Sequence, residues 1–90
     1  MSDSIIKGTI QDIETKEPIP FVDITISWKD HIVARAQTDF SGAFNTTFLG
    51  DGEYSLKAVF IGYKTLTIDH IKVDPGSVID YNDPPLYMSN

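Results

Sequence analysis

The chain has 90 residues with 41% hydrophobic composition, which suits one compact domain over residues 1–90 and leaves no room for a second core. Its 13 acidic and 7 basic side chains give a net charge of -6, which disfavours binding to nucleic acid or anionic lipid. There is no cysteine, which excludes disulfides and thiol chemistry, so stability must come from packing and strand pairing.

Targeting signals are not apparent in the sequence. The N-terminal segment has no basic region followed by an apolar run of about 7 to 15 residues, so we expect no signal peptide on this chain. No apolar run approaches the roughly 20 residues that cross a bilayer, so we expect no direct membrane insertion. Two locations stay open: the cytoplasm, or the cell envelope after removal of a leader.

Period-two alternation predicts strands in the first third of the chain. Residues 6–11 alternate apolar and polar side chains, and this strand stops at Asp12. Residues 13–20 form a polar connector whose two prolines remove strand donors. Residues 22–28, with Trp28 on the apolar face, have the most regular alternation and predict a strand of the core.

Turn residues divide the middle of the chain. A short turn at residues 29–30 precedes a strand over 32–38, where small side chains favour close approach of another layer. Residues 39–42, Asp-Phe-Ser-Gly, predict a turn in which Asp caps the backbone and Gly supplies positive φ. A strand over 43–48 follows, and residues 49–52 predict a tight connection with the Asp-Gly pair typical of hairpins.

The last third predicts two further strands. Residues 54–61 alternate, and Gly62 then predicts a bulge or a close backbone crossing. A strand over 63–73 changes parity between Ile68 and Ile71, which predicts a bulge. After a turn at 74–77, a short strand is expected at either 78–81 or 85–88. The pattern predicts an all-β protein: a single antiparallel Greek-key β-sandwich of about seven strands.

Five short segments in this order and spacing resemble the carboxypeptidase regulatory-like domain, a transthyretin-like β-sandwich common in Bacteroidetes proteins. The resemblance covers about residues 5–73, and residues 74–90 lie outside it. The segments are Ile6-Lys-Gly-Thr-Ile-Gln-Asp12, Glu17-Pro-Ile-Pro-Phe-Val-Asp-Ile24, Thr38-Asp-Phe-Ser-Gly-Ala-Phe44, Gly52-Glu-Tyr-Ser-Leu56 and Phe60-Ile-Gly-Tyr63.

The resemblance implies a motif that sets turns and packing and has no catalytic role. Domains of this family occur beside carboxypeptidase catalytic domains, at the N-terminus of TonB-dependent transporters and in surface proteins, which implies a periplasmic or cell-surface location. Lys16 stands where the family often has Gly. The residues implied are Gly8, Asp39, Gly42, Phe44, Gly52, Tyr54, Gly62 and Tyr63.

Few residues in the sequence are candidates for metal binding or for a covalent reaction. His31 and His70 are the only histidines, and a zinc site would need at least two further ligands. Lys7 with Asn82 suggests the isopeptide bond of similar adhesin folds, but Lys7 alternates away from the core. Aspartates at turns would hold calcium only if several oxygens converged. These aspartates are Asp39, Asp51, Asp69, Asp74, Asp80 and Asp83. We expect no cofactor and no metal.

An enzymatic function is a remote alternative. Transthyretin-like enzymes that hydrolyse 5-hydroxyisourate use histidines and an arginine and end in a Tyr-Arg-Gly-Ser type tail. This chain ends Leu-Tyr-Met-Ser-Asn, and Arg35 is its only arginine. We therefore expect a non-catalytic protein.

Two binding hypotheses remain. The main one is a structural spacer or protein-interaction domain of a cell-envelope protein, whose partner is another protein or an adjoining domain and whose oligomeric state is open. An apolar docking patch would use Phe21, Val33, Val59, Ile61 and Tyr87. The alternative is a carbohydrate- or peptide-binding module that stacks ligands on Trp28, Tyr54, Tyr63 and Tyr81, although the alternation places Trp28 and Tyr54 in the core.

Overall fold

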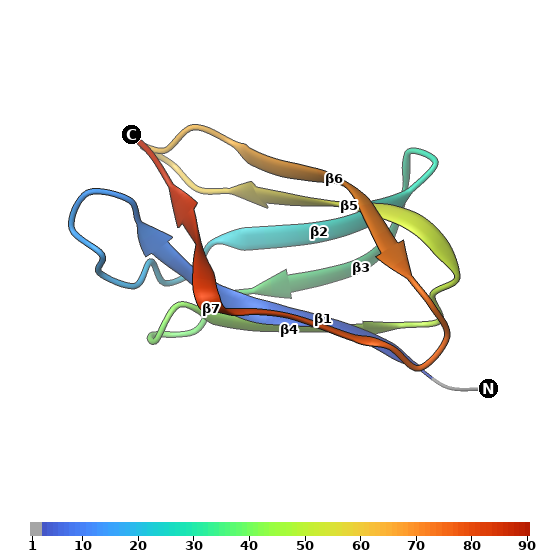
Figure 1. Cartoon of the computed structure of the whole chain (residues 1–90). Helices are drawn as coiled ribbons and strands as arrows, with labels where there is room; N and C mark the ends of the chain where they lie inside the picture. The colour runs from blue at the N-terminus through green and yellow to red at the C-terminus, as the bar shows by residue number, and fades with distance from the viewer. Residues whose placement is uncertain (1–2) are drawn as a thin grey trace.

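The computed structural model describes residues 3–90, which fold as a two-layered β-sandwich (Figure 1). No helix occurs in this range, so none is long and apolar enough to cross a membrane. The predicted all-β sandwich of about seven strands is confirmed. The strands are β1 (Ser4–Asp12), β2 (Asp23–Trp28), β3 (His31–Gln37), β4 (Ala43–Phe48), β5 (Gly52–Val59), β6 (Leu66–Val73) and β7 (Val78–Met88).

The strands form a three-stranded sheet of order β4-β1-β7 and a four-stranded sheet of order β3-β2-β5-β6. Four of the five pairings are antiparallel, but β1 and β7 run parallel, which departs from the predicted antiparallel arrangement. The reason is topological. β7 reaches its sheet from β6 in the other layer, so no hairpin fixes its direction relative to β1.

The core lies between the two sheets and follows the alternation. β1 buries every second residue along its length, and β4 buries Phe44, Thr46 and Phe48. Removing the apolar side chains of both inner faces from water is the main stabilising term. The buried cluster comprises Ile6, Ile10, Ile19, Val22, Ile24, Ile26, Phe44, Phe48, Tyr54, Leu56, Ala58, Ile71, Val73 and Met88.

Three strands at sheet edges carry extra residues. Val33 has no partner between the pairs Ile26↔Ala34 and Ser27↔Ile32. On β6, residues 69–70 oppose a single residue of β5, and His70 has φ 60, which confirms the predicted parity bulge. On β7, three extra residues lie between Tyr81 and Leu86. The last strand is therefore one strand of 11 residues, where the sequence predicted a short one at either end of that range.

Three local predictions are wrong. The 49–51 connection is not a hairpin, because β4 and β5 belong to different sheets. Gly62 makes no close crossing: a Cβ there would meet nothing within 4 Å, although its φ of 87 is that of a turn glycine. Trp28 is 38% exposed because it is the last residue of β2, beside the turn at Lys29 and Asp30, at the rim of the sandwich.

Three loops and the C-terminus gather at one end of the sandwich (Figure 1). The loops are residues 13–22, 38–42 and 60–65, and we call this region the loop end. Backbone hydrogen bonds connect them: Phe21 N–H donates to the Thr38 carbonyl, and Lys64 N–H donates to the Ser89 carbonyl. The two-residue turn after β2 and the 49–51 and 74–77 connections lie at the opposite end.

Candidate functional site

The Asp39 turn is closed by its own side chain. Oδ1 of Asp39 accepts hydrogen bonds from the N–H groups of Ser41 at 2.8 Å and Ala43 at 3.0 Å. Gly42 has φ 74, and a Cβ on it would lie 2.6 Å from the Ile10 carbonyl oxygen. The carboxylate is therefore engaged with local backbone donors, as the sequence predicted for this turn.

Asp12 connects two loops of the loop end. Its Oδ1 accepts hydrogen bonds from the N–H groups of Glu14 and Thr15, and its Oδ2 accepts one from the Tyr63 hydroxyl at 2.8 Å. The Tyr63 hydroxyl, followed by the two N–H groups, lowers the pKa of Asp12 below its usual value, and the same hydrogen bond raises the pKa of Tyr63. We call this the Asp12–Tyr63 clamp.

Thr38 holds the segment that precedes β2. Its hydroxyl accepts a hydrogen bond from Val22 N–H and donates one to the Ile19 carbonyl, both at 2.8 Å. Neither Asp12, the clamp partner of Tyr63, nor Thr38 was predicted as a site residue from the sequence. The only signal in the sequence was that each is a polar residue at the end of a strand. Tyr63 lies 51 positions from Asp12, and Val22 lies 16 positions from Thr38.

The other motif residues are dispersed through the fold. Gly8 is buried, and a Cβ there would lie 2.6 Å from Tyr81 Cβ. Phe44 and Tyr54 are buried in the core, and the Tyr54 hydroxyl accepts a hydrogen bond from Asp51 N–H. Gly52 is the first residue of β5 and Gly62 is a turn residue, and both have positive φ. The eight residues therefore do not converge on one pocket.

Large apolar side chains are exposed at the loop end. Ile61 is 88% exposed and Phe40 is 81% exposed, and Ile13 and Phe21 are each nearly half exposed. Phe21 packs edge-to-face on Phe40, with ring centroids 5.1 Å apart, and has φ 64. A bulky residue at positive φ is strained, and such strain is found at functional sites. We call these four residues the loop-end apolar group.

The predicted docking patch does not form one surface. Phe21 and Ile61 lie at the loop end, and Val59 ends β5 next to it, whereas Val33 is on β3 near the turn at the opposite end. Tyr87 is half-buried, and the Lys16 ammonium lies 4.5 Å from its ring centroid. Lys16 has φ 65, which explains why glycine suits this position in similar proteins.

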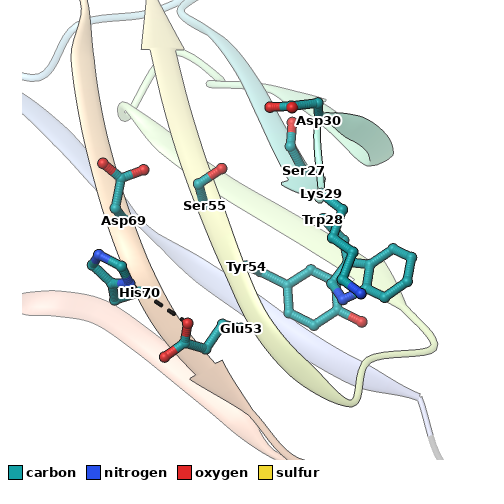
Figure 2. A pocket seen from close by; sticks show the side chains of 9 residues that line it. All are labelled: Ser27, Trp28, Lys29, Asp30, Glu53, Tyr54, Ser55, Asp69 and His70. Atoms are coloured by element: carbon teal, nitrogen blue, oxygen red, sulfur yellow. Dashed lines mark ion pairs between the residues drawn. The ribbon is translucent and has the colours of Figure 1, made fainter.

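A hollow opens at the opposite end, between the Lys29–Asp30 turn and β6 (Figure 2). Its volume is about 660 Å³. Figure 2 shows His70 turned toward Glu53, and their Nδ1 and Oε2 atoms lie 3.5 Å apart. Tyr63 and Tyr81 are not at this hollow, so the four aromatic residues considered for stacking are not brought together. The lining residues are Ser27, Trp28, Lys29, Asp30, Glu53, Tyr54, Ser55, Asp69 and His70.

Metal-binding geometry is not found within residues 3–90, where no group of three His, Cys, Asp or Glu side chains is placed to hold an ion. Lys7 is half-buried on the outer face of β1, and it pairs in register with Asp80 and not with Asn82. Asn82 interacts with the Thr9 hydroxyl and with Asp80. These positions offer no buried lysine for an isopeptide bond.

The fold defines a transthyretin-like β-sandwich module. The sequence profile of the carboxypeptidase regulatory-like domain matches residues 5–83, so the chain belongs to the carboxypeptidase regulatory-like domain family. No curated protein sequence matches the chain.

Solved structures share this fold at low identity. A chain of a type II cohesin–X–dockerin complex from Acetivibrio cellulolyticus has TM-score 0.68 and 22% identity, over 94% of this chain and 56% of that one. The Bacillus anthracis TIE protein has TM-score 0.68 and 18% identity, over 99% and 17%. Klebsiella pneumoniae 5-hydroxyisourate hydrolase has TM-score 0.62 and 21% identity, over 89% and 90%. This chain thus spans about half of the first structure and a sixth of the second.

Proposed function

We propose that this chain is a non-catalytic module that contacts a protein partner or an adjoining domain through the loop-end apolar group, as part of a cell-envelope protein. The observation that carries the proposal is the exposure of Phe40 and Ile61, at 81% and 88%, on loops that are otherwise tightly held. Aromatic and aliphatic side chains presented on a rigid support are typical of the centre of a protein interface.

The loop end is rigid enough to present such a surface. The Asp12–Tyr63 clamp joins the 13–22 loop to the 60–65 loop, and Thr38 joins the 13–22 loop to the 38–42 loop. Fixed loops lose little conformational entropy on binding, so more of the contact energy appears as affinity. The residues that fix these turns therefore contribute to binding by holding the exposed apolar side chains in place.

The edges of the two sheets are poorly suited to pairing with a strand of a partner protein. This favours the loops as the binding surface. β3, β6 and β7 have extra residues that interrupt regular pairing, and β7 also contains Pro84 and Pro85. On β4, the N–H and C=O of Ala43 are already bonded to Asp39. These features shorten the regular edge that a partner strand could pair with in the described part of the chain.

The family and the fold of a chain in a cohesin–X–dockerin complex support an interaction role. The family resemblance supports a periplasmic or cell-surface location. Fractionation of the source organism, with antibody against this chain, tests the location. Recovery only with cytoplasmic proteins would contradict it.

Hydrolysis of 5-hydroxyisourate has little support despite the shared fold. His70 faces Glu53 at the hollow, and His31 is not among the residues that line it. The C-terminal residues Leu86–Met88 continue β7 and carry no arginine. We expect the purified chain to leave the spontaneous decay rate of 5-hydroxyisourate unchanged, as measured by ultraviolet absorbance.

Site-specific crosslinking tests the binding surface. A photoreactive amino acid at position 61 should crosslink to one defined protein in cells of the source organism. The matched control is position 78, because Val78 is also an exposed apolar residue, 57% exposed, but lies at the opposite end. Equal crosslinking from both positions, or none from position 61, would argue against the loop end as the interface.

A further inference from the structure

The first and last strands of the chain are parallel neighbours in one sheet. Two backbone hydrogen bonds mark the limits of their contact, from Ile5 N–H to the Ser77 carbonyl and from Ile13 N–H to the Met88 carbonyl. We call this contact the terminal-strand pairing. It joins seven positions of β1 to β7 in two stretches, residues 5–8 with residues 78–81 and residues 10–12 with residues 86–88.

The parallel direction places the start of β1 and the end of β7 at opposite ends of the sandwich (Figure 1). The molecule is 40 Å long and 23 Å and 18 Å across. Tension applied at the two ends of the chain would therefore pull β1 toward one end of the sandwich and β7 toward the loop end. The two strands would have to slide past each other before the chain could extend.

The direction of the load decides how the hydrogen bonds between the two strands break. In sliding, all the paired positions carry the load together, because every bond is distorted at the same time, and hydrogen bonds weaken steeply with distortion. In peeling, the bonds at the separating end break one after another. Sliding would also draw Ile79, Tyr81 and Leu86 away from the core against which they pack. The parallel pairing is therefore the arrangement that resists tension.

Both ends of the terminal-strand pairing are fixed in the fold. Ser4, the first residue of β1, is fully buried, and its hydroxyl donates a hydrogen bond to the Asp74 carbonyl at 3.0 Å. Met88, the last residue of β7, is buried in the core. The Ser89 carbonyl accepts a hydrogen bond from Lys64 N–H at 2.8 Å. Neither strand is therefore free to fray from its end before the load reaches the pairing.

We propose that this module bears tension, and that the terminal-strand pairing is the mechanical element that resists extension when the chain is pulled at both ends. The resistance is a property of the strand order and does not involve the loop-end apolar group. The mechanical role and the loop-end interface can therefore fail independently of each other.

Single-molecule force spectroscopy of the full chain tests the proposal. The chain has no cysteine, so handles attach only at introduced cysteines. Asp3→Cys with Asn90→Cys loads the pairing in sliding. Asp3→Cys with Val78→Cys peels β7 from β1, because Val78 faces Ile5 in register. Complete unfolding lengthens either tether by roughly 260 Å, so the two geometries differ in the direction of the load and hardly in the length released.

The sliding geometry should give the higher rupture force. At the same loading rate this force should exceed that of the peeling geometry by about twofold or more, because seven paired positions share the load. Melting temperatures of the two cysteine variants verify that both are folded. Equal forces in the two geometries, or a lower force in sliding, would overturn the proposal.

A glycine variant locates the resistance in the terminal-strand pairing. A Cβ at position 8 would lie 2.6 Å from Tyr81 Cβ and 2.8 Å from the Tyr81 carbonyl oxygen, so Gly8→Ala must move β7 away from β1. Its rupture force in sliding should fall toward the value for peeling. Gly62→Ala is the control, because it adds the same methyl group in a turn outside both strands, where it meets no atom within 4 Å. It should keep the wild-type rupture force.

The variants add a second way to contradict the proposal. An unchanged force in Gly8→Ala, or an equal loss of force in Gly8→Ala and Gly62→Ala, would overturn it. If Gly8→Ala does not fold, the comparison of the two pulling geometries still decides the question, because that comparison leaves the terminal-strand pairing intact.

Discussion

Gly42 and Gly62 both have positive φ, 74 and 87, but their surroundings differ. A Cβ at position 42 would lie 2.6 Å from the Ile10 carbonyl oxygen, whereas a Cβ at position 62 would meet no atom within 4 Å. Gly62→Ala should lower the free energy of unfolding by about 1 kcal/mol through backbone strain alone. Gly42→Ala should lower it further because the backbone must also move.

Urea denaturation of the two alanine variants measures the difference. Because both substitutions add the same methyl group at a positive-φ glycine, the comparison isolates the crowding at position 42. Equal losses would mean that the packing of the Asp39 turn against β1 has no part in stability.

The Asp12–Tyr63 clamp predicts a pH-dependent contribution to stability. The folded state lowers the pKa of Asp12 from 3.8, so its contribution is present above this pH and is lost as the pH falls through the folded pKa. The folded state raises the pKa of Tyr63 from 10.0, so the second contribution is lost as the pH rises through the folded pKa. Tyr63→Phe should therefore reduce the melting temperature most near neutral pH.

Melting temperatures of wild type and Tyr63→Phe across this pH range give the test. The gap between the two proteins should narrow below pH 3.8. Tyr87→Phe is the control, because that ring contacts Lys16 and takes no part in the clamp. A gap that is constant with pH would show that the Tyr63 hydroxyl acts through packing alone.

Among the elements, the turn between β2 and β3 does not have the residue pair that stabilises such a turn most. Lys29 and Asp30 both have positive φ, 47 and 66, as a two-residue type I′ hairpin requires, yet Asn-Gly is the preferred pair there. Replacing the pair by Asn-Gly should raise the free energy of unfolding by about 0.5 to 1 kcal/mol. Thermal unfolding checks this, and Asn-Gly placed at the exposed Lys64 and Thr65 positions, neither of which has positive φ, should give no gain.

Much of the fold follows from local sequence. Alternation predicted the buried residues of β1 and β4, and the parity change at Ile68 and Ile71 predicted the β6 bulge. The errors concern pairing: the Asp51-Gly52 signal reports a turn but not that β4 and β5 belong to different sheets. Trp28 was placed in the core because alternation along one strand does not reveal where the facing sheet ends.

The candidate sites were less predictable because they depend on the arrangement of the whole molecule. Phe40 and Ile61 are 21 positions apart, and only the strand order brings their loops to one end. Asp12 and Tyr63 are separated by 51 positions, so the clamp has no local signature.

The most direct test of the account uses the protein that is captured by the crosslink from position 61. The affinity of that protein is measured for the wild-type chain and for variants of the chain. Phe40→Ser combined with Ile61→Ser should weaken binding by at least about tenfold. The double variant should keep its melting temperature, because both side chains are mostly exposed. The control is Leu49→Ser with Val78→Ser, two exposed apolar residues at the opposite end, which should bind as wild type does. Unchanged affinity in the loop-end variant, or equal loss in the control, would contradict the account.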